Sequence, residues 1–207
     1  MGARTSNAAS SANQYLIGVL DLGIGPAEWF DGRIDDLQIY SGTLTQAEVQ
    51  FLFANPGAPL GGGMLGVSYC GPAVVNSSGQ SATTRASGSA SVAANNLTLT
   101  AARLPQSSFG FFLTSRTQGF VQNPGGSSGH LCLSGAIGRY VGPGQIKNSG
   151  TQGTFDLLLN LAQTPTPTGF VQVLTGQTWN FQCWHRDAVG GVPTSNFTDG
   201  LSVLFTS

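Results

Sequence analysis

Residues 179–187 read Trp-Asn-Phe-Gln-Cys-Trp-His-Arg-Asp, and this stretch decides the fold class. Trp179, Phe181 and Cys183 stand two apart, with Asn180 and Gln182 between them. Successive side chains of a β-strand point to opposite faces of its sheet. The alternation therefore predicts a strand with one buried face and one face in water.

The same alternation recurs through most of the chain after residue 64. Four further runs place apolar residues two apart: Leu97/Leu99/Ala101, Phe109/Phe111/Leu113, Phe155/Leu157/Leu159/Leu161 and Leu201/Val203/Phe205. Pro-Gly, Asn-Asn and Gly-Gly turns separate such runs, and none has a helical period. Many short strands without intervening helices predict an all-β fold, an antiparallel β-sandwich resembling a jelly roll.

Composition favours the same fold class and excludes two kinds of partner. The chain has 30 glycines, and its polarity comes mainly from uncharged residues, which suits turns and short strands better than helices. Charged residues make up 8% of the chain and the formal net charge is -1, so we expect no nucleic-acid partner. No apolar run reaches the roughly 18 residues of a membrane span, so we expect no membrane insertion.

Glycine and proline cluster in residues 55–63, where neither a helix nor a strand persists. We therefore place a domain boundary here. Residues 1–57 form a first segment, 58–63 a linker, and 64–207 a β-sandwich module.

The first segment contains two apolar runs, 15–20 and 30–40, which predict strands. An inserted residue at Asp35-Asp36 would keep the apolar residues of the second run on one face, as in a β-bulge. Thr45 and Glu48 then form a capping box. This predicts a short helix near residues 45–53.

Residues 30–40 read Phe-Asp-Gly-Arg-Ile-Asp-Asp-Leu-Gln-Ile-Tyr, and Leu44-Thr45 and Ala47-Glu48-Val49 follow. Together they resemble the final strand and trailing helix of laminin-G-like, concanavalin A-like jelly rolls. The resemblance covers about residues 13–57, the closing part of such a module. Half a sheet exposes an edge and an apolar face, so we expect this segment to pack on the second module or on another chain.

Calcium is the one cofactor that this resemblance suggests, because such jelly rolls often hold the ion through aspartates and backbone carbonyls. The candidate ligands here are Asp31, Asp35 and Asp36. Aspartate is also common in turns and bulges for local hydrogen bonds, which is the alternative interpretation.

The second segment resembles an uncharacterised module found near the C-termini of large secreted bacterial proteins. The matching words are Tyr69-Cys70-Gly71-Pro72, Leu131-Cys132-Leu133, Gly138-Arg139-Tyr140-Val141-Gly142-Pro143-Gly144, and Trp179 through Arg186-Asp187. The resemblance implies an extracellular location. Residues 1–14 lack the apolar core of a signal peptide, so we expect the export signal in a longer precursor.

Three cysteines, Cys70, Cys132 and Cys183, show no Cys-x-x-Cys spacing, which argues against zinc. One disulfide and one leftover thiol are expected, and Cys70 with Cys132 is the pairing we favour. Pairings through Cys183, or three reduced buried cysteines, remain alternatives.

The strand at 179–187 carries an aromatic residue on its polar face. A sugar ring can stack on such an aromatic while amides and guanidinium groups bind its hydroxyls, which predicts a carbohydrate-binding platform. The candidate residues are Trp184, Gln182, Asn180, Arg186, Tyr140 and Arg139. In the alternative interpretation, Trp184 covers a loop and Arg186 pairs with Asp187 or Asp199.

Residues suited to catalysis are few. His130 lies in a Gly/Ser loop, and His185 shares the buried parity of its strand. There is no Gly-x-Ser-x-Gly elbow and no evident carboxylate pair. We expect a non-catalytic extracellular binding or adhesion module that contacts carbohydrate. The rival is a structural spacer or anchoring domain, and a polysaccharide-active enzyme is a distant third.

Overall fold

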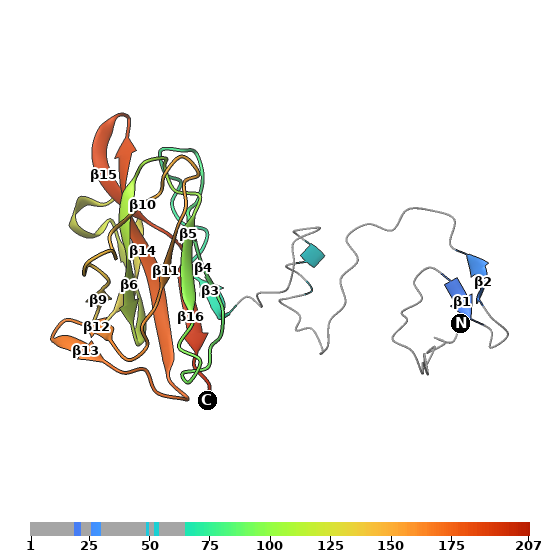
Figure 1. The fold of residues 1–207 in the computed structure, drawn as a ribbon. Coiled ribbons are helices and arrows are strands. Elements are labelled where there is room, and N and C mark those ends of the chain that lie inside the picture. Colours follow the sequence, from blue (N-terminus) through green and yellow to red (C-terminus); the bar gives the residue numbers. More distant parts are fainter. Residues whose placement is uncertain (1–18, 22–25, 30–48, 50–51, 54–64) are drawn as a thin grey trace.

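Antiparallel β-strands make up nearly all the regular structure of the described residues (Figure 1). The computed structural model describes residues 19–21, 26–29, 49, 52–53 and 65–207. The predicted all-β, antiparallel fold is confirmed. Among the described residues, no helix has the length and apolar character needed to cross a membrane.

The largest sheet has seven strands and is built around one long strand. Its order is β10-β6-β14-β16-β3, with β15 also paired to β14 and β9 to β6. Its strands are β3 (Val67–Tyr69), β6 (Phe109–Ser115), β9 (Gly138–Arg139), β10 (Lys147–Asn148), β14 (Thr178–Val189), β15 (Val192–Phe197) and β16 (Gly200–Leu204). The 12-residue β14 pairs with β6, β15 and β16, so this central sheet depends on it.

A three-stranded sheet, ordered β11-β5-β4, packs on one face of the central sheet. Its strands are β4 (Thr83–Ser87), β5 (Thr98–Ala102) and β11 (Phe155–Leu158). The main core lies between the two sheets, where Leu99 of β5 meets Phe112 of β6 and Phe181 of β14, all 0% exposed. The side chains predicted to turn inward, including Leu157, Trp179 and Val203, are buried there.

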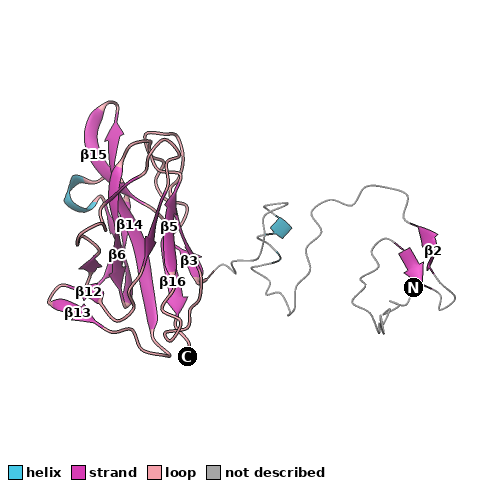
Figure 2. Ribbon diagram, in the orientation of Figure 1, coloured by secondary structure: helices cyan, strands magenta, loops and turns pink. Residues whose placement is uncertain are grey.

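A hairpin of β7 (Thr117–Gln122) and β8 (His130–Ser134) covers part of the opposite face of the central sheet. Leu133 of β8 packs there against Leu113 and Phe197 in a second, smaller apolar cluster. A 3-10 turn, Pro124–Gly126, connects the two hairpin strands (Figure 2). Three layers are therefore stacked at this point of the molecule.

A further pair of short strands, β12 (Thr164–Thr166) and β13 (Gly169–Val171), forms its own antiparallel sheet. Phe170 of this pair is 70% exposed.

In the first segment the structure describes one antiparallel pair, β1 (Val19–Asp21) and β2 (Pro26–Trp29). The predicted strand 15–20 overlaps β1, whereas β2 was not predicted. The strand predicted at 30–40, with its bulge, lies outside the described residues.

Of the helix predicted near residues 45–53, Val49, Leu52 and Phe53 are helical. Its capping residues and the linker at 58–63 lie outside the described residues. The packing of residues 1–57 on the second module or on another chain stays a prediction.

Candidate functional site

The pairing of β6 with β14 brings aromatic side chains together on the face of the central sheet that points away from the main core. Trp184 stands opposite Phe111, with ring centroids 5.0 Å apart and planes inclined by 31°. Both side chains are half-buried against the second apolar cluster. Phe109 lies two residues before Phe111, hence on the same face, and is 49% exposed.

Two arginines lie on this same face. Arg139 of β9 stands opposite Leu113 of β6, and Arg186 follows Trp184 by two residues. Both are exposed. We call the set Phe109, Phe111, Trp184, Arg139 and Arg186 the aromatic face.

Neither arginine of the aromatic face forms an ion pair with a carboxylate of the described residues. Across the part of the chain that the structure describes, the only salt bridge joins Arg85 to Asp199, at 3.1 Å. Arg186 therefore pairs with neither Asp187 nor Asp199, the alternative that the sequence had left open. Both guanidinium groups retain their donors for a ligand.

The charge of the second module supports attraction of anions to its surface. Residues 65–207 contain six Arg or Lys and three Asp, a formal charge of +3. Asp187 and Asp199 are 8% and 5% exposed, which leaves Asp156 as the exposed carboxylate in this range. A weakly acidic chain thus has a locally basic module.

Two residues of the predicted platform are not accessible, and this part of the prediction is corrected. Asn180 and Gln182 are 2% and 0% exposed because the β7–β8 hairpin covers them. The Asn180 side chain accepts a hydrogen bond from Gln118 and donates one to the carbonyl of Ser115, at 3.1 and 3.2 Å. Period-two alternation indicated a polar face but not that a hairpin covers it.

Gln182 joins three segments through its buried amide. Its Oε1 accepts a hydrogen bond from the Cys132 amide at 2.9 Å. Its Nε2 donates to the carbonyls of His130 and Thr198, at 2.9 and 2.8 Å. The side chain therefore attaches the covering hairpin to β14 and contributes to structure, not to ligand contact.

Tyr140 lies on the other side of the sheet, in the main core, and is 1% exposed. Burial raises the pKa of its hydroxyl, and the nearby Thr164 hydroxyl opposes this shift. Tyr140 is therefore not part of the predicted platform. Of its six residues, Trp184, Arg186 and Arg139 share an accessible face.

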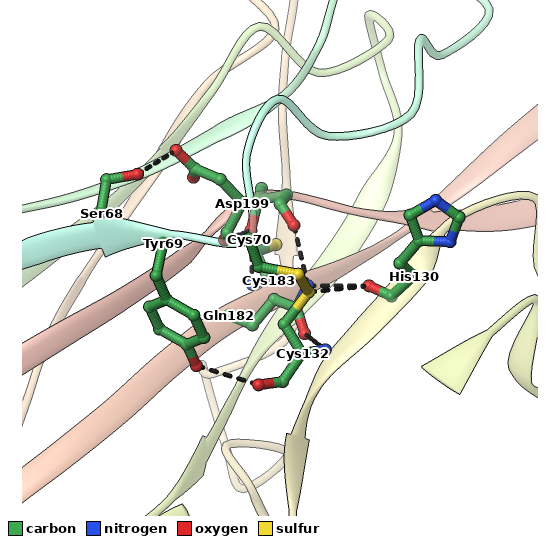
Figure 3. The surroundings of a disulfide bond; sticks show 9 residues. Ser68, Tyr69, Cys70, His130, Cys132, Gln182, Cys183 and Asp199 are labelled. Carbon is green, nitrogen blue, oxygen red and sulfur yellow. Dashed lines mark hydrogen bonds between the residues drawn. A yellow bond between two sulfur atoms is a disulfide. The ribbon is translucent and has the colours of Figure 1, made fainter. Parts of the chain in front are cut away.

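The predicted disulfide is present. Cys70 and Cys132 are bridged with their Cα atoms 6.3 Å apart, 62 positions apart in sequence (Figure 3). Next to it, the Tyr69 hydroxyl donates a hydrogen bond to the Cys132 carbonyl at 3.1 Å. Cys183 is the free cysteine; it is fully buried, and burial raises the pKa of its thiol.

The carboxylate of Asp199 connects three strands. It accepts a hydrogen bond from the Ser68 hydroxyl at 2.8 Å (Figure 3). It also accepts one from the Thr84 amide at 2.6 Å, besides its salt bridge to Arg85. All of these partners belong to the neighbouring strands β3 and β4. Asp199 thus holds the start of β16 to β3 and β4.

His185 and Asp187 have separate partners. His185 Nδ1 lies 3.1 Å from the Arg186 carbonyl. Asp187 accepts hydrogen bonds from the Ser77 amide at 2.9 Å and from the Asn196 side chain at 3.1 Å. In this arrangement Asp187 does not orient the His185 imidazole as the aspartate of a catalytic triad does.

We expect stability to fall on mild acidification because of His185. Burial lowers its pKa, against the opposing effects of the Arg186 carbonyl and the Asp187 charge. The unfolded chain then binds a proton more readily than the folded one, so stability falls as the pH drops below about 6.5, the ordinary value for histidine. Burial alone would raise the pKa of Asp187, but its hydrogen bonds lower it, which adds a loss at lower pH.

Urea unfolding at several pH values between neutral and about pH 5 measures this dependence. His185→Gln should reduce it, and His130→Gln, which keeps His185, is the matched control. A wild-type stability that stays constant over this range contradicts the assignment.

The candidate calcium ligands Asp31, Asp35 and Asp36 lie outside the described residues. Within the ranges that the structure does describe, no three His, Cys, Asp or Glu side chains come close enough together to hold a metal ion.

Comparison of the chain with models of known protein families, with curated proteins and with solved structures found no match.

Proposed function

We propose that residues 65–207 form a non-catalytic extracellular binding module that contacts carbohydrate through the aromatic face. The observation that carries the proposal is a half-exposed aromatic pair, Trp184 and Phe111. It lies on the same sheet face as two arginines that have no carboxylate partner among the described residues. Aromatic rings offer an apolar surface to the C–H face of a sugar, and guanidinium groups donate hydrogen bonds to its oxygens.

Two observations support an extracellular setting. A disulfide is typical of proteins that fold in oxidising compartments. The resemblance of the second module to a module of large secreted bacterial proteins supports the same location.

The absence of catalysis is proposed because the titratable groups do not converge. His185, Asp187 and Asp199 are buried, and each is held by its own structural partners. An enzyme of the hydrolase or lyase type needs such groups in an accessible cleft.

A glycan array with the oxidised protein tests the proposal. Trp184→Ala should weaken binding about tenfold or more, because it removes the stacking surface. Trp184 also packs in the second apolar cluster, so Arg186→Gln, at an exposed position, separates lost contact from lost stability. Phe170→Ala removes an exposed aromatic on β13 and is the matched control.

Glycan binding that survives both Trp184→Ala and Arg186→Gln contradicts the assignment to the aromatic face. A second candidate function is a spacer or anchoring domain without a ligand. The burial of Asn180 and Gln182 favours it, because these polar side chains form hydrogen bonds inside the protein and do not contact a ligand. A wild-type protein that binds nothing on the array supports this second function.

A further inference from the structure

A cavity separate from the aromatic face opens where β6 ends and β14 begins. Its volume is about 310 Å³, at the small end of the roughly 300–1,000 Å³ typical of ligand pockets. Arg116 and Thr117 line it on one side, and Gln177 and Trp179 on another. None of the residues of the aromatic face lines this cavity, so the two sites are distinct.

Hydrogen bonds inside the protein decide what Gln177 can offer a ligand. Its Oε1 accepts from the Leu174 amide at 3.1 Å and from Trp179 Nε1 at 3.0 Å. Both lone pairs of that oxygen are therefore in use. The NH₂ group remains, and it is a donor.

Arg116 makes the cavity cationic. Its side chain is exposed, and it forms no ion pair with any carboxylate in the described residues. No aspartate or glutamate lines the cavity. A guanidinium and an amide NH₂ together bind a carboxylate better than they bind a neutral group.

The remaining lining suits the rest of a sugar. Val171, which is 41% exposed, supplies apolar surface for ring carbons, and the buried Trp179 closes the cavity toward the core. Gln172 supplies an amide for ring hydroxyls, and the Thr166 hydroxyl, which donates to the Gly169 carbonyl at 3.0 Å, can still accept a hydrogen bond. The volume suits one monosaccharide unit.

We propose that this cavity binds an acidic sugar, with its carboxylate at Arg116 and Gln177. The site is independent of the aromatic face, and its occupant is a single uronic-acid unit, free or at the end of a glycan.

Methyl β-D-glucuronide and methyl β-D-glucoside form a matched pair of probes, because they differ in carrying a carboxylate or a hydroxymethyl group. Titration of the ¹⁵N-labelled full chain to about 20 mM, followed by NMR, detects even millimolar binding. The glucuronide should shift resonances of residues 115–117 and 171–179, including the Gln177 side-chain NH₂, and should bind about tenfold or more tightly than the glucoside.

Arg116→Gln should reduce glucuronide affinity about tenfold or more, while Arg103→Gln, another exposed arginine, leaves it unchanged. Equal binding of the two probes, an Arg116→Gln variant with wild-type affinity, or no shifts at the highest concentration each overturns the proposal.

Discussion

The double substitution Cys70→Ser and Cys132→Ser should lower the free energy of unfolding by about 4 kcal/mol. The bridge joins residues 62 positions apart, and closing so long a loop removes much conformational freedom from the unfolded chain. Small domains commonly have a total stability of about 5–15 kcal/mol, so this loss is a large share of it. The hydrogen bond from Tyr69 to the Cys132 carbonyl weakens in addition if β8 shifts.

Urea unfolding of the wild type and the double variant, each with and without a reducing agent, measures the effect. Reduction should destabilise the wild type and leave the stability of the double variant unchanged. The double variant thereby controls for effects of the reducing agent other than cleavage of the disulfide. A thiol count on the denatured, unreduced wild type should give one free thiol, that of Cys183. Three free thiols would reject the disulfide.

Gln182→Met should cost about 3 kcal/mol or more, although the two side chains are similar in length. The substitution leaves the Cys132 amide and the carbonyls of His130 and Thr198 without the partner they have now. A buried polar group without a hydrogen bond costs about 1–3 kcal/mol, and here three are affected. The β7–β8 hairpin should loosen first, since Gln182 attaches it to β14.

Gln122→Met is the matched control, because Gln122 is an exposed residue of β7. Its effect should stay within about 0.5 kcal/mol. Hydrogen exchange of the β8 amides adds a local measurement, in which faster exchange is expected for the Gln182 variant. A Gln182→Met protein with wild-type stability would show that the amide is not what holds the hairpin.

The sandwich could be predicted because its core follows period-two alternation. Leu99 and Leu157 on one sheet, and Phe181 and Val203 on the other, are buried as the alternation indicates. The alternation is read within each strand, so the sequence predicts which side chains are buried without knowledge of strand pairing.

The third layer could not be predicted in this way. Alternation assigns a polar residue to the face away from the core, yet Asn180 and Gln182 are covered by a hairpin whose backbone satisfies them. Alternation also assigns the wrong face of β6 to the main core. The run Phe109/Phe111/Leu113 points away from the main core, and Phe112 fills that core instead. The consecutive apolar residues from Phe111 to Leu113 were the available signal that both faces of β6 are apolar.

The site was predictable in part. Trp184 and Arg186 share a face, as predicted, because they stand two apart on the same strand. Arg139 lies on that face because it stands opposite Leu113 of β6. Phe109 and Phe111 joined them only through strand register, which depends on long-range pairing. The cavity beside Arg116 is formed by segments far apart in sequence, so no local pattern indicated it.

The position of the disulfide also determines how the second module would respond to mechanical tension. The edge strand β3 is three residues long, and among the described strands it pairs with β16 alone. A pull on the chain before Leu65 would therefore load this short pairing and the Ser68–Asp199 hydrogen bond first. Cys70 follows β3 directly, and its covalent bond to Cys132 passes the load to β8. Detachment would stop after residues 65–69, and the two cores behind the bridge would remain closed while the bond is intact.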